Sequence, residues 1–249
     1  MPADQRYQED PNLPGYWFYD GLRIQAMLDV HLFAVDFAKR TLAPNASILD
    51  VAAGEGALTK QLLDAGFQVS CTTWNDKVAV DVMSYRLDLD VPFACDSVGG
   101  RKYDLVCAIE IIEHIENPSA FLRSCASVLS PGGILMVSTP NVESAAARFQ
   151  WLIRGCPLIF ETGEVRSNRH ISMMWRQGIE FLIECAGCRI VERHFLGQPL
   201  LRPSLTSLLK RGIYALLSRI AWGDVVGETR LYILESVREP KSAGPSEVY

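Results

Sequence analysis

The stretch Ile48-Leu49-Asp50-Val51-Ala52-Ala53-Gly54-Glu55-Gly56 decides the fold of this 249-residue chain. An apolar run of strand length leads into it, and apolar residues at helical spacing follow over residues 57–65. A strand that ends in glycines and passes directly into a helix brings free backbone N–H groups close to a ligand. The stretch therefore predicts a βα unit that carries a nucleotide-type ligand on its turn.

Apolar runs of strand length alternate with helical periods on both sides of this turn, which is typical of βαβ units and a parallel sheet. We expect strands over residues 47–52, 67–73, 92–95, 103–110, 134–138, 189–195 and 230–237. We expect helices over residues 20–42, 57–65, 77–85, 118–129 and 176–186. Between residues 141 and 176 the pattern predicts no element.

Charge and cysteine content restrict the function. The net charge of −5 provides no overall positive field, which argues against nucleic acid as a partner. The seven cysteines are an odd number and lie mostly in apolar runs, which is typical of reduced thiols. Residues 1–14 have neither the basic start nor the apolar run of a secretory signal. We therefore expect a cytoplasmic protein.

Four motifs follow one another between residues 45 and 195. They are Asn45 to Gly56, Asp88-Leu89-Asp90-Val91-Pro92-Phe93, Lys102-Tyr103-Asp104-Leu105-Val106 and Leu129-Ser130-Pro131-Gly132-Gly133. In this order they resemble the class I S-adenosylmethionine-dependent methyltransferases, in particular the ubiquinone-biosynthesis O-methyltransferase type. The resemblance implies an α/β fold with a Rossmann-like, doubly wound sheet of seven mostly parallel strands and an antiparallel last strand. It also implies S-adenosylmethionine as cofactor.

The same resemblance assigns the cofactor-binding residues to the ends of the strands. They are Asp50, Ala52, Gly54 and Gly56 at the turn, Asn75 after the second strand, Asp88 in the acidic stretch before the expected third strand and Glu110 after the fourth. At the end of the second strand, relatives carry an acid whose carboxylate accepts hydrogen bonds from both ribose hydroxyls. Thr73 stands at that place here, so Asn75 or Asp76 has to replace the acid.

The cluster Glu110-Ile111-Ile112-Glu113-His114 follows the fourth strand, at the edge where open α/β sheets bind ligands. His114, assisted by Glu113, has the chemistry of a general base toward an acceptor hydroxyl. Alternatively, Glu110, Glu113, His114 and the distant His170 bind Mg²⁺ or another divalent cation, as the likeness to ubiquinone-biosynthesis and small-RNA 2′-O-methyltransferases implies. A third alternative is that Glu113 and His114 only cap their loop.

The chain is expected to divide into three parts. Residues 1–44 form an N-terminal helical lid, residues 45–238 the methyltransferase domain, and residues 239–249 a flexible tail. A helical insertion is expected at about 198–227, where basic residues beside an apolar face fit a peripheral membrane contact, a substrate cap, a dimer face or simple packing.

The predicted reaction is O-methylation of a small-molecule, glycan or lipid-linked acceptor. Two alternatives stay open. A metal site would suit an RNA 2′-O-methyltransferase, and the missing ribose acid would suit a methyltransferase-like module that binds without turnover.

Overall fold

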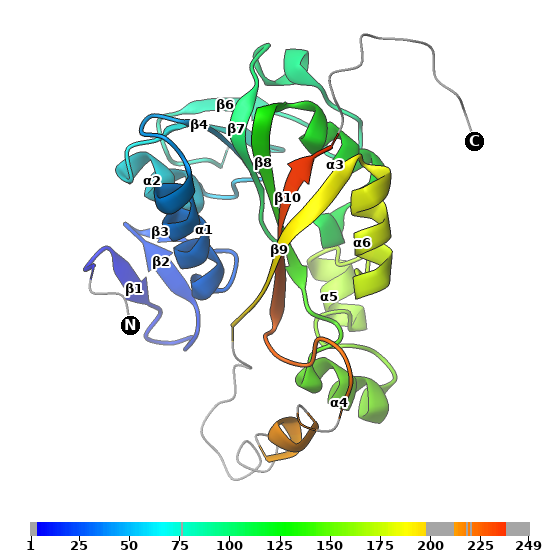
Figure 1. Ribbon diagram of the computed structural model, residues 1–249. Coiled ribbons are helices and arrows are strands. Elements are labelled where there is room, and N and C mark those ends of the chain that lie inside the picture. The colour runs from blue at the N-terminus through cyan, green and yellow to red at the C-terminus, as the bar shows by residue number, and fades with distance from the viewer. Residues whose placement is uncertain (1–3, 76, 198–211, 218, 220, 238–249) are drawn as a thin grey trace.

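The structure, a computed structural model, describes residues 4–75, 77–197, 212–217, 219 and 221–237. Its centre is a seven-stranded sheet in the order β6-β5-β4-β7-β8-β10-β9 (Figure 1). The strands are β4 (Ser47–Val51), β5 (Gln68–Thr73), β6 (Met83–Arg86), β7 (Tyr103–Ala108), β8 (Leu129–Pro140), β9 (Cys188–Leu196) and β10 (Thr229–Ser236). Neighbouring strands in the part β6-β5-β4-β7-β8 run parallel, and β10 runs antiparallel to both of its neighbours, β8 and β9. The predicted fold class is confirmed.

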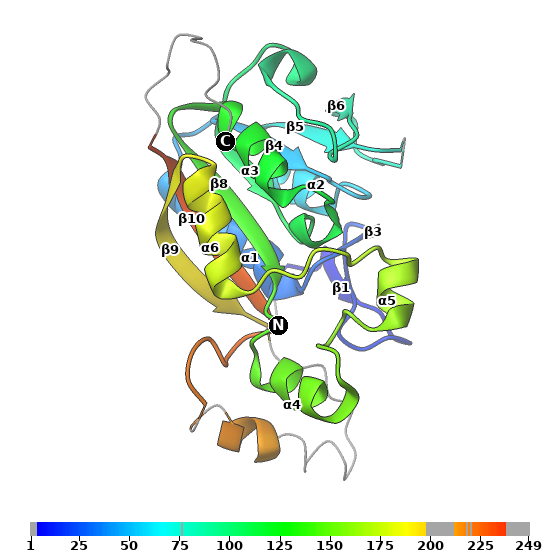
Figure 2. The same cartoon turned by 90° about the vertical axis from the view of Figure 1, so that its right-hand side faces the viewer.

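Helices cover both faces of the sheet. On one face lie α1 (Leu28–Thr41) and α2 (Ala57–Asp64), and on the other lie α3 (Pro118–Ser127) and α6 (Arg176–Cys185), as Figures 1 and 2 show. Because side chains alternate along a strand, Ile48 belongs to the core under α1 and α2, whereas Leu49 belongs to the core under α3 and α6. The carboxyl ends of the parallel strands are left open between these two layers.

The link between β5 and β6 differs from the prediction. Residues 77–85 were expected as a helix and residues 92–95 as a strand, but the third strand is Met83–Arg86 and a 3-10 turn, Cys95–Val98, follows it. The link over residues 74–82 is shorter than the dozen or so residues that a crossover helix needs. Its alternating valines are β-branched and favour extended chain, which explains the error.

The N-terminal segment also differs from the expected helix. Three short strands, β1 (Tyr7–Glu9), β2 (Trp17–Tyr19) and β3 (Leu22–Arg23), form a separate antiparallel sheet before α1. The turn between β2 and β3 is Asp20-Gly21, and both residues have positive φ, 51° and 79°. An Asp-Gly pair of this kind is typical of a two-residue hairpin, so the prediction of helix over residues 20–27 was wrong.

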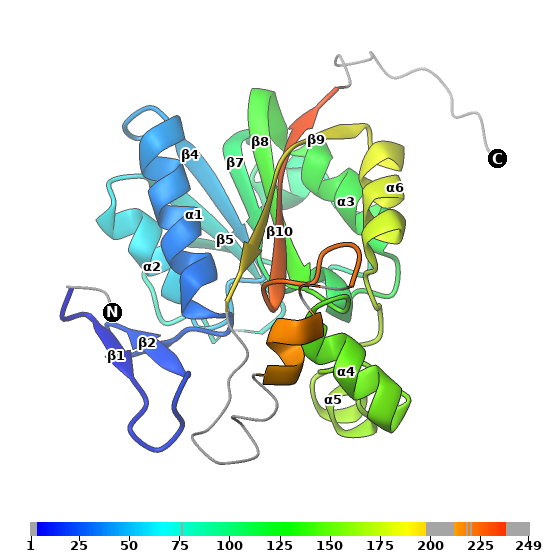
Figure 3. The ribbon, with the colours of Figure 1, turned by 60° about the horizontal axis from the view of Figure 1, so that its bottom comes forward.

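Two helices between β8 and β9 were not predicted. They are α4 (Ala145–Arg154) and α5 (Thr162–Ser167), and both lie beyond the carboxyl edge of the sheet, opposite the N-terminal sheet (Figure 3). Of the expected insertion, residues 212–217 and 219 are helical. Residues 198–211, 218 and 220, and the predicted tail at 239–249, lie outside the described residues. No helix in the described part of the chain is long and apolar enough to cross a membrane.

Candidate active site

The glycine turn between β4 and α2 has a special backbone. Ala52, Gly54 and Gly56 have positive φ angles of 61°, 59° and 97°. Glycine adopts such angles freely, whereas an alanine there costs about 1–2 kcal/mol. Thr72 of β5 holds the strained residue, because its Oγ1 accepts the Ala52 N–H at 2.9 Å and its carbonyl accepts the Ala53 N–H at 3.1 Å. The turn is therefore fixed by the neighbouring strand.

Asp50 lies beneath the turn rather than on its surface. Its side chain is buried, and its Oδ2 accepts a hydrogen bond from Thr59 Oγ1 at 2.6 Å. Burial raises the pKa of Asp50 to about 7. This carboxyl ties β4 to α2 and so fixes the orientation of the turn toward a ligand. Direct contact between Asp50 and the cofactor stays a prediction.

Two segments of the chain line the glycine turn. A Cβ added to Gly54 would lie 2.4 Å from Gln25 Oε1, and one added to Gly56 would lie 2.8 Å from Val80 Cγ2. Glu55 connects both segments to the turn, since its carboxylate accepts the Arg23 N–H at 3.0 Å and its carbonyl accepts the Ala79 N–H at 3.1 Å. The end of the Gln25 side chain thus occupies the space beside Gly54, where a larger residue would displace it.

The end of β5, where relatives place their ribose acid, is occupied by a local turn. Thr73 Oγ1 accepts the Asn75 N–H at 3.2 Å and donates to the Asn75 carbonyl, and Asn75 Oδ1 accepts the Lys77 N–H at 3.2 Å. Asp76 lies outside the described residues. Asp88, after β6, accepts the Asp90 N–H at 3.0 Å. Asn75 thus follows β5 as expected, whereas Asp88 follows the third strand instead of preceding it, because that strand is β6 (Met83–Arg86).

Glu110 and Glu113 form the acidic half of the second cluster. Glu110 has a positive φ of 48°, and Ser138 at the end of β8 holds it, accepting its N–H at 3.0 Å and donating to Oε1 at 2.8 Å. Burial raises the pKa of Glu110 to about 7. Glu113 is fully buried, and its Oε2 has no hydrogen-bond partner. Burial, and then the charge of Glu110, raise the pKa of Glu113 well above its usual range.

Residues 168–172 bring the second histidine to this cluster. The Ile171 and Ser172 N–H groups donate to the Glu113 carbonyl at 3.0 and 2.9 Å, and Arg169 lies 3.3 Å from Glu116. As a result the rings of His114 and His170 lie edge to face with centroids 4.7 Å apart. Two residues separated by 56 positions in the sequence thus become neighbours.

Both histidines contact a backbone carbonyl through the same ring nitrogen. His114 Nδ1 lies 2.6 Å from the Asn168 carbonyl, and His170 Nδ1 lies 2.7 Å from the Ile159 carbonyl. A carbonyl oxygen only accepts, so each neutral ring carries its proton on Nδ1 and keeps a free lone pair on Nε2. Burial, and then the nearby His170, lower the pKa of His114, which keeps its ring neutral near pH 7.

Three of the four predicted metal ligands converge. The ligand atoms of Glu113, His114 and His170 all lie within 4.8 Å of one another. An ion about 2.1 Å from each ligand allows a separation of at most about 4.2 Å, so side-chain shifts of roughly half an ångström would close the site. Backbone carbonyls on the second ring nitrogens are the usual support for metal-bound histidine. Glu110 lies outside this group and contacts Ser138 instead.

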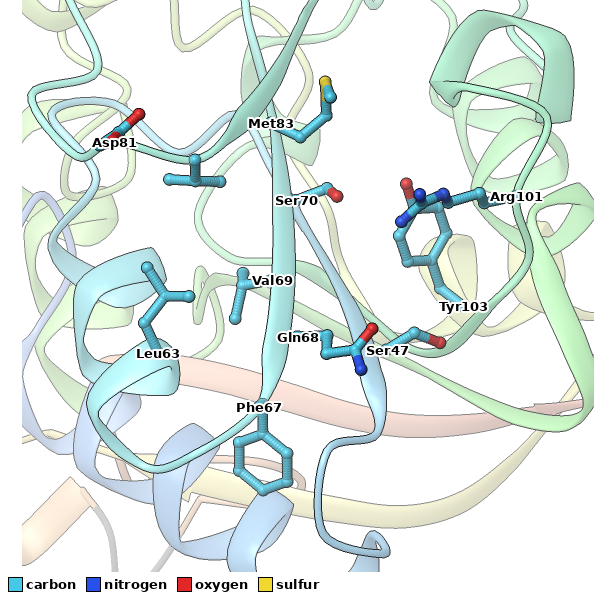
Figure 4. Close-up of a pocket in the computed structure, with 11 residues that line it drawn as sticks. Ser47, Leu63, Phe67, Gln68, Val69, Ser70, Asp81, Met83, Arg101 and Tyr103 are labelled. Carbon is cyan, nitrogen blue, oxygen red and sulfur yellow. The ribbon is translucent and has the colours of Figure 1, made fainter.

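A cavity of about 370 Å³ lies at the opposite edge of the sheet (Figure 4). Its walls include the first residues of three parallel strands, Ser47, Gln68 and Tyr103, together with Asp81 and Met83 at the link between β5 and β6. It opens where that link lacks a helix. Since the predicted site residues lie at the carboxyl ends of the strands, this cavity is not part of the site.

A family model described as a methyltransferase domain matches residues 19–193, well over half of the chain. The chain belongs to this methyltransferase family. The prediction of a class I, S-adenosylmethionine-dependent methyltransferase is thereby confirmed.

Curated relatives are named ubiquinone biosynthesis O-methyltransferase. The protein of Caulobacter vibrioides is 32% identical over 117 residues, which are 44% of this chain and 46% of the relative. The protein of Xanthomonas campestris pv. campestris is 33% identical over 146 residues, which are 53% and 58% of the two chains. The methyltransferase described here thus spans about half the length of the curated relatives that it matches.

Solved methyltransferases share the fold. An S-adenosylmethionine-dependent methyltransferase from Archaeoglobus fulgidus has a TM-score of 0.54 at 15% identity, covering 82% of this chain and 93% of that chain. Phosphoethanolamine N-methyltransferase 2 of Haemonchus contortus, solved with S-adenosylmethionine, has a TM-score of 0.56 at 17% identity. The match covers 84% of this chain and 52% of that chain. At such identities the likeness concerns the fold alone.

Several residues that contact the candidate site could not be found from the sequence. Gln25 was hidden in a segment expected to be helical, and Ser138 lies on β8, remote in sequence from the Glu110 that it holds. The carbonyls of Ile159 and Asn168 are backbone atoms, for which no side-chain pattern exists. The Asp20-Gly21 pair was the one available indication that Gln25 follows a hairpin.

Proposed function

We propose that this methyltransferase transfers a methyl group from S-adenosylmethionine to a hydroxyl of a small, lipid-linked or glycan acceptor, with a divalent cation at the Glu113, His114 and His170 cluster. The observation that carries the proposal is the convergence of these three side chains beside the carboxyl end of β7, where each histidine Nδ1 meets a backbone carbonyl and leaves Nε2 as the nitrogen that can bind an ion. The names of the curated relatives support oxygen as the methylated atom.

The glycine turn binds the cofactor in this proposal. When bound, S-adenosylmethionine supplies a methyl group activated by a positively charged sulfur. Gly54 and Gly56 permit close approach to the backbone, while Ala52, Asn75, Asp88 and Glu110 lie at the neighbouring strand ends. The chain contributes chiefly by aligning the two reactants, and such alignment supplies a large part of the rate.

The histidine cluster acts on the acceptor. Glu113, His114 and His170 would hold a divalent ion, which lowers the pKa of an acceptor hydroxyl. The unpartnered Oε2 of Glu113 supports this role, because a buried carboxylate oxygen without a partner is costly unless a cation or donor meets it. If no ion binds, the same neutral His114 Nε2 accepts the hydroxyl proton as a general base, with Glu113 beside it.

The acceptor class rests on charge and on exposed apolar residues near the carboxyl edge. Leu152 on α4 is 81% exposed and Trp222 is 92% exposed, which suits an apolar or lipid-linked acceptor and a peripheral membrane contact. RNA as acceptor would need an open basic groove, whereas Arg169 pairs with Glu116, and Arg230 is buried against Glu143. A module that binds without turnover is favoured only by Thr73 in place of the ribose acid.

A methyl-transfer assay tests the proposal. The protein is incubated with S-adenosylmethionine labelled in the methyl group and with a catechol, a phenol, a hexose and a short RNA in parallel. We expect label on the catechol or phenol, loss of transfer with excess EDTA, and recovery with Mg²⁺ or Mn²⁺. Full transfer in excess EDTA would reject the cation, and label on RNA alone would reject the acceptor class. No transfer despite cofactor binding would favour the binding module.

A further inference from the structure

Gln25 lies between the N-terminal sheet and α1, with its side chain on the glycine turn. Its Oε1, Cδ and Nε2 come within 2.4, 2.8 and 3.3 Å of the position that a Cβ on Gly54 would occupy. We propose that the Gln25 amide binds the amino-acid end of S-adenosylmethionine, its carboxylate and ammonium groups. This inference rests on the proposed function and assigns one further residue to its cofactor site.

The position of Gln25 selects the amino-acid end over the rest of the cofactor. The acceptor cluster around His114 follows β7, so the transferable methyl group has to face that side of the turn. The family resemblance implies that the ribose end lies beside β5, where Thr73 stands. The remaining side of the turn is the one at Gly54, and Gln25 covers it.

The chemistry of an amide matches that end. A carboxylate needs donors and an ammonium needs acceptors, and glutamine offers both on one neutral group. The two carboxylates nearest in sequence are already engaged, because Asp50 is buried against Thr59 and Glu55 accepts the Arg23 N–H. Gln25 is thus the polar side chain free to serve a zwitterion on this side of the turn.

The backbone on either side of Gln25 is anchored. Ile24 is buried, and its N–H donates to the Trp17 carbonyl at 2.9 Å. Tyr19, in the same small sheet, donates its hydroxyl to Asp64 of α2 at 2.8 Å. The N-terminal sheet therefore fixes the backbone at Gln25, while its exposed side chain beside Gly54 is accessible to a ligand.

Binding of two nucleosides that differ only at this end tests the inference. S-adenosylhomocysteine and 5′-methylthioadenosine share adenosine and a neutral thioether, but the second lacks the amino-acid portion. Gln25→Leu keeps the size of the side chain and removes its hydrogen bonds. A matched control is Gln8→Leu, at an exposed position of the same small sheet. Each protein is titrated calorimetrically with both ligands, and its fold is checked by circular dichroism.

We expect Gln25→Leu to weaken S-adenosylhomocysteine binding about tenfold or more, which is the usual effect of losing a hydrogen bond to a charged group. Its affinity for 5′-methylthioadenosine should stay within about twofold, as should both affinities of Gln8→Leu. Equal loss for both ligands, or loss for neither, overturns the assignment of Gln25 while leaving the proposed function intact. If the wild type binds neither ligand, both proposals fail.

Discussion

The glycine turn and the histidine cluster, the two halves of the proposed site, are built in opposite ways. The turn is made of consecutive residues, 50–56, and its shape comes from three positive φ angles. The cluster joins Glu113 and His114 to His170, which reaches them through backbone hydrogen bonds from residues 171 and 172. A local motif therefore supplies the cofactor half, whereas tertiary contacts supply the acceptor half. We expect substitutions in one half to leave the other working.

The largest difference between the effects on turnover and on cofactor binding is expected for a substitution of His114. His114→Ala removes the Nε2 lone pair that binds the cation or takes the proton, so kcat should fall by about 100-fold or more. Its affinity for S-adenosylhomocysteine should stay within about twofold, because the turn is untouched. Turnover and calorimetric titration measure the two effects.

A matched control is His194→Ala on β9, where the ring packs against Phe33 away from the cluster. This variant should keep both kcat and affinity. Unchanged turnover in His114→Ala would contradict the role of the cluster.

Asp50 gives the turn a pH dependence. Its folded pKa, about 7, lies above its unfolded value near 3.8, so between these values the native state keeps a proton that the unfolded chain has lost. The contribution of Asp50 to stability is full below pH 3.8 and is lost as the pH rises toward 7.

Asp50→Asn should therefore be more stable than the wild type at pH 8, and the difference should vanish near pH 4. The full pKa shift corresponds to roughly 4 kcal/mol, and we expect about half of it after relaxation of the site. Urea unfolding of both proteins from pH 4 to 8 measures the difference. A difference that is constant with pH would refute the buried, protonated carboxyl.

Substitutions of two glycines with similar backbone angles distinguish the effect of backbone strain from the effect of a side-chain clash. Gly56 and Gly66 have φ of 97° and 93°, but a Cβ meets Val80 at 2.8 Å only at Gly56, while nothing lies within 4 Å at Gly66. Alanine at Gly66 should cost about 1–2 kcal/mol in unfolding free energy from backbone strain alone, and alanine at Gly56 should cost more because its Cβ also meets Val80. Only Gly56→Ala should also weaken S-adenosylhomocysteine binding, by about tenfold, since the turn has to shift. Equal affinities in both variants would show that Gly56 has no part in the site.

A substitution of Ala52 should have the smallest effect of these, and it should raise the stability of the protein instead of lowering it. Its φ of 61° is strained for alanine, so Ala52→Gly relieves about 1–2 kcal/mol and loses about 0.5–1 kcal/mol to the greater freedom of the unfolded chain. We expect a net stabilisation under about 1 kcal/mol, seen as a rise in Tm of a few degrees, with unchanged cofactor affinity. A fall in Tm would mean that the methyl group of Ala52 packs favourably.

The elements predicted correctly are those with local evidence. β4, α2, β7 and α3 are bounded by glycine, proline or a capping asparagine, and each has its own periodicity. The hairpin at Asp20-Gly21 and the extended link through Val80 were missed because their apolar residues also fit a helix. The helices α4 and α5 were missed because tertiary packing decides them more than pattern does.

The residues of the candidate site also divide into those with local sequence evidence and those that depend on tertiary contacts. Gly54, Gly56, Glu113 and His114 stand in short motifs, so they could be proposed as site residues from the sequence alone. His170 was selected only through resemblance, and its contact with His114 depends on a loop anchored by residues 113–116. Gln25 could not be predicted, because its contact with Gly54 depends on how the N-terminal sheet docks on α2.

The most direct test of the two-part site is calorimetric titration of the wild type and His170→Ala, each with Mn²⁺ and with S-adenosylhomocysteine. His170 is remote in sequence from both motifs, and its contacts among the described residues are with His114, Phe160 and the Ile159 carbonyl. We predict that the wild type binds both, and that His170→Ala loses at least about tenfold in Mn²⁺ affinity, as expected when a ligand or its support is removed. S-adenosylhomocysteine should bind both proteins equally. Equal Mn²⁺ binding by the two proteins, or parallel loss of both ligands in the variant, would contradict the account.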